Sequence, residues 1–346
     1  MRAVVRMSGK SGDVRLMDIP EPTAGPGQLK LRVVYGGICS SDARMIYRDM
    51  VEGERLRTPV VVGHEGVGTV VEVGEGVTGF AIGDLVASET TFTNCGVCEF
   101  CHAGETGVCV DRSSLGWSAN GYWAEYIVVN QRFSHKLAPH VNPKGAAVLE
   151  PFTCGLKGVT QRGRIIAGDW VAVWGPGPIG MGAMQAALAS GARTIMVGTE
   201  RGRPRLEIAK KLGARLTLVS GVDDVAAQIR AITGGLGAHM CIEAAGSQAA
   251  YNEAAASLRR LGQMIMLAGF HSGHVEVGTR DLLYTQASIV GAEGTNPASW
   301  DLAVELLNAG LVDMDAMVSH VFPLEKWEEA VAQTSSHLGM KVLLQP

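Results

Sequence analysis

WVAVWGPGPIGMGAMQAALASGA, residues 170–192, is the stretch that decides the fold of this chain. It predicts a short apolar strand, a glycine-rich turn and an amphipathic helix. The turn has the pattern G-x-G-x-x-G, formed by Gly175, Gly177, Pro178, Ile179 and Gly180. Such glycines permit a tight turn and let a pyrophosphate approach the amino end of the helix, so the stretch predicts a dinucleotide site. A glycine-rich turn without a ligand is the alternative.

Strands and helices keep alternating after this motif. TIMVGT (194–199), LTLVS (216–220) and GQMIMLAG (262–269) are apolar runs with helical segments between them. This alternation is typical of a doubly wound parallel sheet. We therefore expect an α/β dinucleotide-binding domain over residues 156–293.

The second strand of this domain ends at Glu200, about twenty residues after the last glycine of the motif. An acid there accepts hydrogen bonds from the ribose hydroxyls and repels a 2′-phosphate, which favours NAD. Arg201, Arg203 and Arg205 follow directly, and a guanidinium facing a 2′-phosphate would favour NADP. A solvated helix start would explain the same arginines. We expect NAD, keep NADP as the alternative, and count Glu200 and Arg205 among the cofactor-binding residues.

The chain before residue 155 is rich in short β-branched runs. LKLRVVYGGI (29–38), GVGTVVEVG (66–74) and WAEYIVV (123–129) are bounded by Gly, Pro, Asp and Asn. They predict a β-barrel-like domain over residues 1–155, and we expect residues 294–346 to fold back onto it. Two domains also suit a chain of 346 residues, which is too long for one ordinary core.

Composition excludes several classes of partner. Hydrophobic residues make up 47% of the chain and charged residues 18%, which is typical of a globular enzyme. The formal net charge of −4 gives no reason to expect nucleic acid or an anionic membrane. The first residues lack an apolar signal segment and no run of eighteen apolar residues occurs. We expect a cytoplasmic protein.

Four of the seven cysteines lie within one short segment, NCGVCEFCHAGETGVC. Cys95, Cys98, Cys101 and Cys109 have the spacing C-x2-C-x2-C-x7-C, which lets four thiolates converge on one tetrahedral ion. Four thiolates leave no open position, so a zinc ion there would be structural. An odd number of cysteines without a secretory signal argues against disulfides, whereas spacing alone does not exclude an iron–sulfur cluster.

A second set of metal-binding residues lies in the same part of the chain. Cys39 is in GGICSSD, His64 and Glu65 are in VVGHEGVG, and Glu150 is in VLEPFTCG. A catalytic zinc takes about three protein ligands and keeps one position open. A thiolate, an imidazole and a carboxylate are suitable donors, and their occurrence together with a dinucleotide motif predicts a catalytic metal.

With these motifs, the chain resembles the zinc-containing medium-chain dehydrogenase/reductases, in the branch of sorbitol and threonine dehydrogenases. The resemblance rests on GICSSD, GHE, the four cysteines, the E-P before the second domain, GPGPIG and KVLL, and it covers nearly the whole chain. It implies a GroES-like domain, a Rossmann domain, two zinc ions and an NAD(P) cofactor. It further implies reversible oxidation of a secondary alcohol of the polyol, cyclitol or amino-alcohol type to a ketone, and a homodimer or homotetramer. Aromatic or simple aliphatic alcohols are the alternative substrates.

The same resemblance assigns roles to individual residues. Cys39 and His64 would bind the catalytic zinc, and either Glu65 or Glu150 would be the third protein ligand. Ser41 matches the hydroxyl that contacts the substrate oxygen. Asp42 matches the carboxylate that orients the zinc-bound histidine.

Three places depart from the family pattern. Arg44 stands where many relatives have the histidine that ends a proton relay. It would meet a cofactor phosphate or an anionic group of the substrate, or form a surface salt bridge. Thr295 and Asn296 stand where sorbitol-type relatives carry an Arg–Tyr pair in the polyol pocket. Trp117 falls where pocket walls commonly lie, although a core position would explain it equally. An aromatic wall would favour a ring or an apolar substrate over a long polyol.

Three other classes of protein fit the sequence less well. A zinc-free quinone reductase would lack the four cysteines and the Cys39–His64 pair. A binding protein on the same fold would typically have lost a metal ligand. A zinc-ribbon nucleic-acid module would carry a basic stripe, which this chain lacks.

Overall fold

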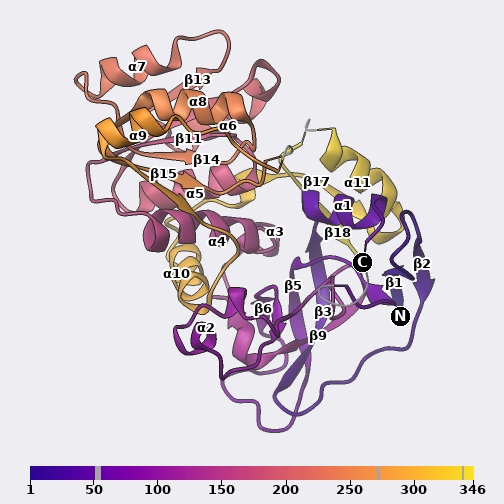
Figure 1. Cartoon of the computed structure of the whole chain (residues 1–346). Helices are drawn as coiled ribbons and strands as arrows, with labels where there is room; N and C mark the ends of the chain where they lie inside the picture. Colours follow the sequence, from indigo (N-terminus) through magenta and orange to yellow (C-terminus); the bar gives the residue numbers. More distant parts are fainter. Residues whose placement is uncertain (51–55, 271–272, 337–338) are drawn as a thin grey trace. The chain divides into compact units, whose positions relative to one another are not determined.

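The computed structural model describes residues 1–50, 56–270, 273–336 and 339–346 (Figure 1). The chain divides into two compact units. The first unit contains Met1–Glu150, Thr295–Gly310 and Met314–Pro346, and the second contains Pro151–Gly294 and Leu311–Asp313. The sequence had placed the boundaries after residues 155 and 293.

The first unit is built on a seven-stranded sheet. Its strands are β3 (Gln28–Gly37), β5 (Glu65–Val73), β6 (Leu85–Ser88), β9 (Tyr126–Asn130), β10 (Ser134–Lys136), β17 (Val318–Pro323) and β18 (Lys341–Gln345). Six follow the order β10-β6-β5-β3-β18-β17, and β9 also pairs with β3. β18, the last strand of the chain, lies antiparallel to β3 and parallel to β17. The C-terminal residues therefore lie beside the end of β3, where the first metal-binding residue follows.

Smaller elements complete the first unit. β1 (Arg2–Arg6), β2 (Val14–Asp18) and β4 (Val60–Val61) form a three-stranded sheet, and β7 (Thr91–Thr93) pairs with β8 (Ser113–Ser114). The helices are α1 (Ser40–Tyr47), α2 (Glu99–His102), α3 (Pro143–Ala146), α10 (Pro297–Asn308) and α11 (Trp327–Ser335). α4 (Leu149–Lys157) begins in the first unit and continues in the second.

Trp123 fixes the packing next to the predicted catalytic metal site. Its side chain is fully buried, and its indole Nε1 donates a hydrogen bond to the Gly37 carbonyl at 3.0 Å. Gly63, the residue before His64, has φ +91°, and a Cβ at this position would collide with the indole ring. Glycine is required at position 63 for both reasons, because only glycine tolerates this φ without strain. The tryptophan and the glycine together set the path of the chain into His64.

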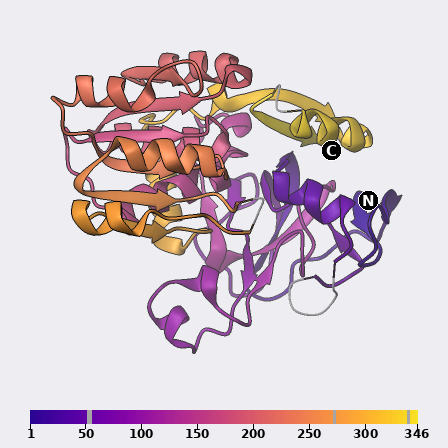
Figure 2. The same ribbon diagram turned by 45° about the horizontal axis from the view of Figure 1, so that its top comes forward.

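The second unit is a six-stranded parallel sheet with helices on both faces (Figure 2). Its strands, in the order β13-β12-β11-β14-β15-β16, are β13 (Leu216–Val219), β12 (Arg193–Gly198), β11 (Trp170–Trp174), β14 (Ala238–Glu243), β15 (Leu258–Met266) and β16 (Ser288–Gly291). The helices are α5 (Pro178–Ala189), α6 (Arg203–Lys211), α7 (Val225–Ile232), α8 (Gln248–Ser257) and α9 (Thr279–Thr285). All neighbouring strands of this sheet run parallel. The expected doubly wound sheet is confirmed.

The glycine-rich turn joins β11 to α5. Gly175 has φ +100°, and a Cβ there would meet the backbone of Ala244 after β14 at 2.8 Å. A Cβ on Gly180 would collide with the Gly175 carbonyl. Gly177 is the N-cap of α5 at φ −83°, and a Cβ there would meet nothing within 4 Å. The outer two glycines of the motif are thus demanded by the fold, whereas Gly177 lies open at the helix end.

Among the described residues, no helix is long and apolar enough to cross a membrane.

Gly175→Ala is expected to destabilise the second unit, and Gly177→Ala is its matched control. Because alanine at position 175 adds both a left-handed strain and a backbone collision, we expect the free energy of unfolding to fall by about 2–4 kcal/mol. At position 177 the change should stay below about 1 kcal/mol. Urea unfolding followed by tryptophan fluorescence measures both values. Equal losses in the two variants would contradict the argument.

Candidate functional site

Three side chains able to bind a metal converge beyond the end of β3. Cys39 follows that strand and is the N-cap of α1, while His64 directly precedes β5 and Glu65 is the first residue of β5. One ligand atom from each of the three lies within 4.8 Å of the other two. Ligands of a tetrahedral zinc, at about 2.0–2.3 Å from the ion, are separated by about 3.3–3.8 Å. The arrangement is therefore compact enough for one zinc ion.

Asp42 orients two of these residues. Its carboxylate is fully buried; Oδ2 accepts a hydrogen bond from the Cys39 backbone N–H at 2.8 Å, and Oδ1 lies 2.9 Å from His64 Nδ1. With Nδ1 engaged by Asp42, the histidine offers Nε2 as a ligand atom, which is the usual arrangement for a metal-bound imidazole. Burial alone lowers the pKa of His64, but the Asp42 carboxylate outweighs it and raises this pKa well above its usual value. A metal and a proton compete for this ring.

Lys341 is a buried cation beside the same site. It opens β18, and its ammonium donates to the Ile38 carbonyl at 3.1 Å and contacts Glu65 Oε2. Burial lowers the pKa of Lys341, but the Glu65 carboxylate outweighs this effect and the net pKa is raised. Lys341 was not predicted from the sequence as a residue of this site. The sequence does contain a signal for it: a charged lysine directly precedes the apolar residues of KVLL, in a strand that is otherwise typical of a core.

The donor atoms of the site fit a zinc ion. A thiol sulfur, an imidazole nitrogen and a carboxylate oxygen converge there, and zinc accepts all three donor types. Oε1 of Glu65 is also buried without a hydrogen-bond partner in the described part of the chain. The residues therefore fit the metal that the sequence predicts.

Three other predicted residues lie around this group. Glu150, in the first turn of α4, receives a hydrogen bond of 3.4 Å from Thr90 Oγ1, and its charge acts on both Glu65 and Lys341. It is not one of the three residues whose ligand atoms converge. Ser41 lies partly exposed in the first turn of α1. Arg44 lies one turn later on the exposed face of that helix.

The predicted pocket residues have other contacts in the structure. Trp117 packs against the buried cluster of the first unit that contains Trp123 and Trp327. Asn296 is the N-cap of α10: its Oδ1 accepts from the Ser299 N–H at 2.9 Å, and its Nδ2 donates to Glu105 Oε1 at 3.0 Å. Thr295 is buried next to it. A role of these residues in substrate binding stays a prediction.

The four clustered cysteines form a second metal-binding group in the first unit. The sulfur of Cys95 lies 3.8 Å from that of Cys101 and 3.6 Å from that of Cys109. Four thiolates about 2.3 Å from a zinc ion are separated by about 3.8 Å, so the spacing fits a closed tetrahedral site. Backbone N–H groups of Val97 and Cys98 lower the pKa of Cys95 to about 6, which favours the thiolate. None of the seven cysteines forms a disulfide.

The cofactor residues predicted from the sequence lie at one edge of the second unit's sheet. β11 and β12 are neighbouring parallel strands, so the glycine turn after β11 and Glu200 after β12 share the carboxyl edge. Pro178 opens α5 directly after Gly177, which leaves the first N–H groups of the helix free to face a phosphate. Glu200 forms an exposed ion pair with Arg203 at 2.6 Å, and this hydrogen bond lowers the pKa of the carboxyl. Arg205 lies within α6.

Two family models match this chain. The one described as "Alcohol dehydrogenase GroES-like domain" matches residues 25–139, and the one described as "Zinc-binding dehydrogenase" matches residues 178–309. Together they cover more than half of the chain. The expected pairing of a GroES-like domain with a dinucleotide-binding domain is confirmed.

Three similar proteins span the chain from end to end. A sorbitol dehydrogenase of Halalkalibacterium halodurans is 34% identical over 100% of this chain and 99% of its own. A D-arabitol-phosphate dehydrogenase of Enterococcus avium is 33% identical over 100% and 97%. An L-threonine 3-dehydrogenase of Bacillus velezensis is 32% identical over 100% and 99%.

Solved structures agree with this grouping. A zinc-binding dehydrogenase from Sinorhizobium meliloti 1021 bound to NADP is 29% identical, with a TM-score of 0.87 over 100% of this chain and 99% of its own. An alcohol dehydrogenase from Escherichia coli CFT073 complexed with NADH is 28% identical, with a TM-score of 0.87 over 100% and 99%. Relatives of this chain thus bind either form of the nicotinamide cofactor.

Cys98→Ser and Cys39→Ser are expected to remove one zinc ion each with opposite consequences. Loss of Cys98 opens a closed site, so the variant should lose about 2–5 kcal/mol of stability while the folded fraction keeps its activity. Loss of Cys39 should abolish turnover at nearly unchanged stability. Zinc analysis, thermal unfolding and activity per folded chain give the three readouts. A Cys98→Ser protein with normal zinc and stability would contradict the structural role.

Lys341→Met is expected to destabilise the metal-free protein more than the zinc-loaded protein. Removing the ammonium leaves Glu65 buried without a counter-charge, which costs about 3–5 kcal/mol of unfolding free energy. Bound zinc supplies positive charge instead, so the loss should shrink after metal loading. Urea unfolding with chelator and with zinc measures both states.

The matched control for this variant is Lys326→Met, which removes an exposed lysine paired with Glu329 at 3.3 Å. It should cost less than about 1 kcal/mol in either state. The same loss with and without zinc for Lys341→Met would show that the lysine does not balance the site's charge.

Proposed function

The chain belongs to the zinc-containing medium-chain dehydrogenase/reductase family, and on that premise we propose that it oxidises a secondary alcohol of the polyol type to a ketone with NAD. Hydride transfer between an alcohol and a nicotinamide cofactor is the activity of this zinc-dependent enzyme family. The single observation that supports the proposed site is the convergence of Cys39, His64 and Glu65, oriented by Asp42 and neutralised by Lys341.

Cys39, His64 and Glu65 would hold the catalytic zinc. When bound, zinc supplies a Lewis acid that lowers the pKa of an alcohol and polarises a carbonyl in the reverse direction. The chain's own residues prepare the site for it. Asp42 fixes the ring of His64 and the backbone of Cys39, and Lys341 holds one oxygen of Glu65, which leaves the other oxygen toward the metal. Glu150 is the alternative ligand, held beside the group by Thr90.

Ser41 is the proposed acceptor of the alcohol proton. It lies two residues after Cys39 in the first turn of α1 and is partly exposed, so its hydroxyl can exchange protons with water. Arg44 cannot continue a relay, because a guanidinium stays protonated in proteins. We therefore infer a short path in which the proton passes from Ser41 to solvent.

NAD binding is assigned to the glycine turn and Glu200. The pyrophosphate would bind at the amino end of α5 beside Gly177, which has no side chain to obstruct it. Glu200 favours the unphosphorylated ribose of NAD. Its pairing with Arg203 is exposed on both sides, and exposed ion pairs are weak, so the carboxylate is available to the ribose hydroxyls.

Self-association is proposed through the sheet of the second unit. β16 is an edge strand of that sheet, with Ser288 and Ile289 exposed, and a strand from a second chain could extend it. We also propose a cytoplasmic location, because a cluster of four cysteines without a disulfide suits a reducing compartment.

The decisive assay is absorbance at about 340 nm, which reports the reduced nicotinamide. We expect reduction of NAD with polyols and other secondary alcohols, slower reduction of NADP, and loss of the signal after chelation. Because Thr295 and Asn296 replace the family's Arg–Tyr pair, sorbitol itself should be a weak member of the panel. Cyclitols, threonine, and primary and aromatic alcohols complete it.

The control is zinc-reconstituted protein after chelation, which should recover the signal. A preference for aromatic alcohols would contradict the polyol assignment and favour Trp117 as a pocket wall. No reduction with any alcohol, at full zinc content, would contradict the proposed reaction.

A further inference from the structure

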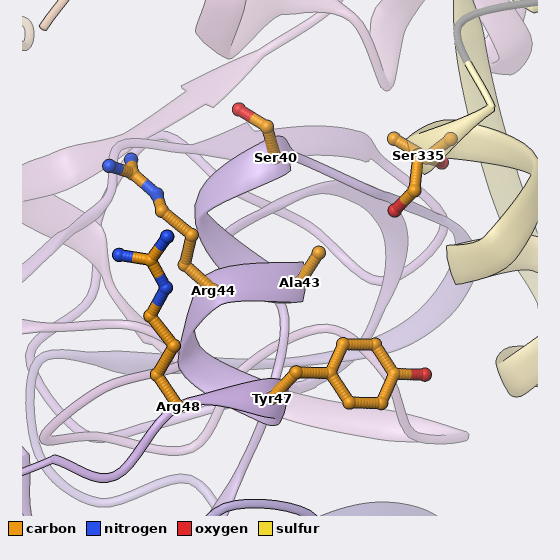
Figure 3. A pocket seen from close by; sticks show the side chains of 7 residues that line it. Ser40, Ala43, Arg44, Tyr47, Arg48 and Ser335 are labelled. Carbon is orange, nitrogen blue, oxygen red and sulfur yellow. The ribbon is translucent and has the colours of Figure 1, made fainter. Parts of the chain in front are cut away.

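A pocket of about 290 Å³ lies between α1 and α11 of the first unit (Figure 3). Its lining includes Ser40, Arg44 and Tyr47 from α1, the C-cap residue Arg48 of that helix, and Thr334 and Ser335 from α11. The N-cap of α1 is Cys39, the proposed zinc ligand, so the pocket follows the catalytic group along the same helix. None of the proposed metal-binding residues lines the pocket, but Ser40, which does, directly follows Cys39 in the chain.

Two arginines give the pocket its charge. Arg44 and Arg48 are four residues apart, and Figure 3 shows their guanidinium groups side by side on one flank of α1. Both are exposed, and neither side chain has a hydrogen bond or ion pair in the described part of the chain. Like charges at this spacing repel each other, and an anion bound between the two guanidinium groups would relieve this repulsion.

The opposite flank of the helix has a different character. Tyr47 points toward α11, away from the arginines, in Figure 3. Partial burial, and after it the charge of Glu328, raises the pKa of Tyr47. An acid therefore acts on the Tyr47 side of the pocket, and the positive charge is concentrated on the side of Arg44 and Arg48. An anion that enters the pocket is drawn to that side.

We propose that Arg44 and Arg48 bind the phosphate of a phosphorylated polyol, so that the substrate of this enzyme is a phosphate ester of a short polyol. This inference rests on the proposed dehydrogenase function. A phosphate monoester carries nearly two negative charges and three acceptor oxygens, which matches two guanidinium groups with five N–H donors each. The Ser40 hydroxyl in the first turn adds a further donor.

Helix geometry sets the length of that substrate. At about 1.5 Å per residue, Arg44 and Arg48 lie about 7.5 Å and 13.5 Å along the helix from Cys39, and their side chains can reach back toward its start. A phosphate held by both is then separated from the catalytic group by a chain of a few carbons. The alcohol of a short polyol phosphate can reach the catalytic group while its phosphate binds the two arginines. A phosphate of the cofactor need not lie at this distance from the catalytic group.

The cofactor is the other source of phosphate. The second unit already offers the amino end of α5 to a pyrophosphate, and Arg201 and Arg203 lie next to Glu200 where a 2′-phosphate would bind. The arginine pair of α1 belongs to the first unit, on the helix of the proposed substrate-activating residues. The substrate's phosphate is the better match.

The test compares D-arabitol and xylitol with their terminal monophosphates on the zinc-loaded enzyme. Variants are Arg44→Gln, Arg48→Gln and the double variant, with Arg32→Gln on β3 as the control for loss of one exposed arginine. The wild type should prefer the phosphates by kcat/KM. We expect this preference to fall roughly 10-fold for each arginine and about 100-fold for both, since each provides charge-assisted hydrogen bonds. Arg32→Gln should keep the wild-type preference.

Two further measurements separate the possible outcomes. Calorimetric titration of the polyol phosphate into the zinc-loaded protein should give binding that the double variant loses. Titration of NAD and NADP should give affinities that the double variant keeps within about threefold. Cofactor affinities that fall while the preference for phosphates stays unchanged would overturn the proposal and assign the arginines to the cofactor.

The failure of this inference differs from failure of the proposed function. Oxidation of free polyols without any preference for their phosphates would overturn the phosphate site and leave the dehydrogenase intact. No oxidation of any alcohol would overturn the function, and calorimetry would still decide the site: binding of the phosphate that requires both arginines supports it, and no binding overturns it.

Discussion

The buried contact between Lys341 and Glu65 is the interaction on which the rest of the first unit depends. It joins the last strand of the chain to the first residue of β5, and the same ammonium donates to Ile38, directly before Cys39. A buried ion pair stabilises a fold only when both charges are satisfied. The second oxygen of Glu65 has no hydrogen-bond partner in the described part of the chain, so it can bind a metal ion. The same carboxylate therefore joins the last strand of the first unit to the proposed metal site.

The second constraint is steric. His64 and Glu65 can converge with Cys39 only if the chain turns sharply at Gly63, where the indole of Trp123 occupies the space of a side chain. The indole in turn donates to Gly37, just before Cys39. One tryptophan thus contacts both segments that carry the metal-binding residues. The four-cysteine lobe needs no such core, because its own thiolates and the metal would hold it together.

Much of the fold and of the metal sites could be predicted from the sequence, because the informative residues belong to short local patterns. The glycine turn, the four cysteines and the alternation of strands and helices each act over fewer than about thirty residues. No sequence pattern distinguishes Glu65 from Glu150 as a ligand, and the contact of Glu65 with Lys341 joins residues 276 positions apart. The side chain of Asn296 caps α10 and bonds Glu105, which lies 191 residues earlier in the chain. Long-range pairings of this kind leave no periodic signal.

Helix α1 shows how chemistry and selectivity can be separated on one element. Its buried face carries Asp42, Met45 and Ile46, which fix the helix and the metal-binding residues. Its exposed face carries Arg44, Tyr47 and Arg48, which contribute nothing to that packing. Because residues four apart on a helix share a face, the exposed positions can change without moving Cys39 or Asp42. A family with one reaction and many alcohols can therefore vary the substrate's distant end on this face while the reacting end keeps its geometry.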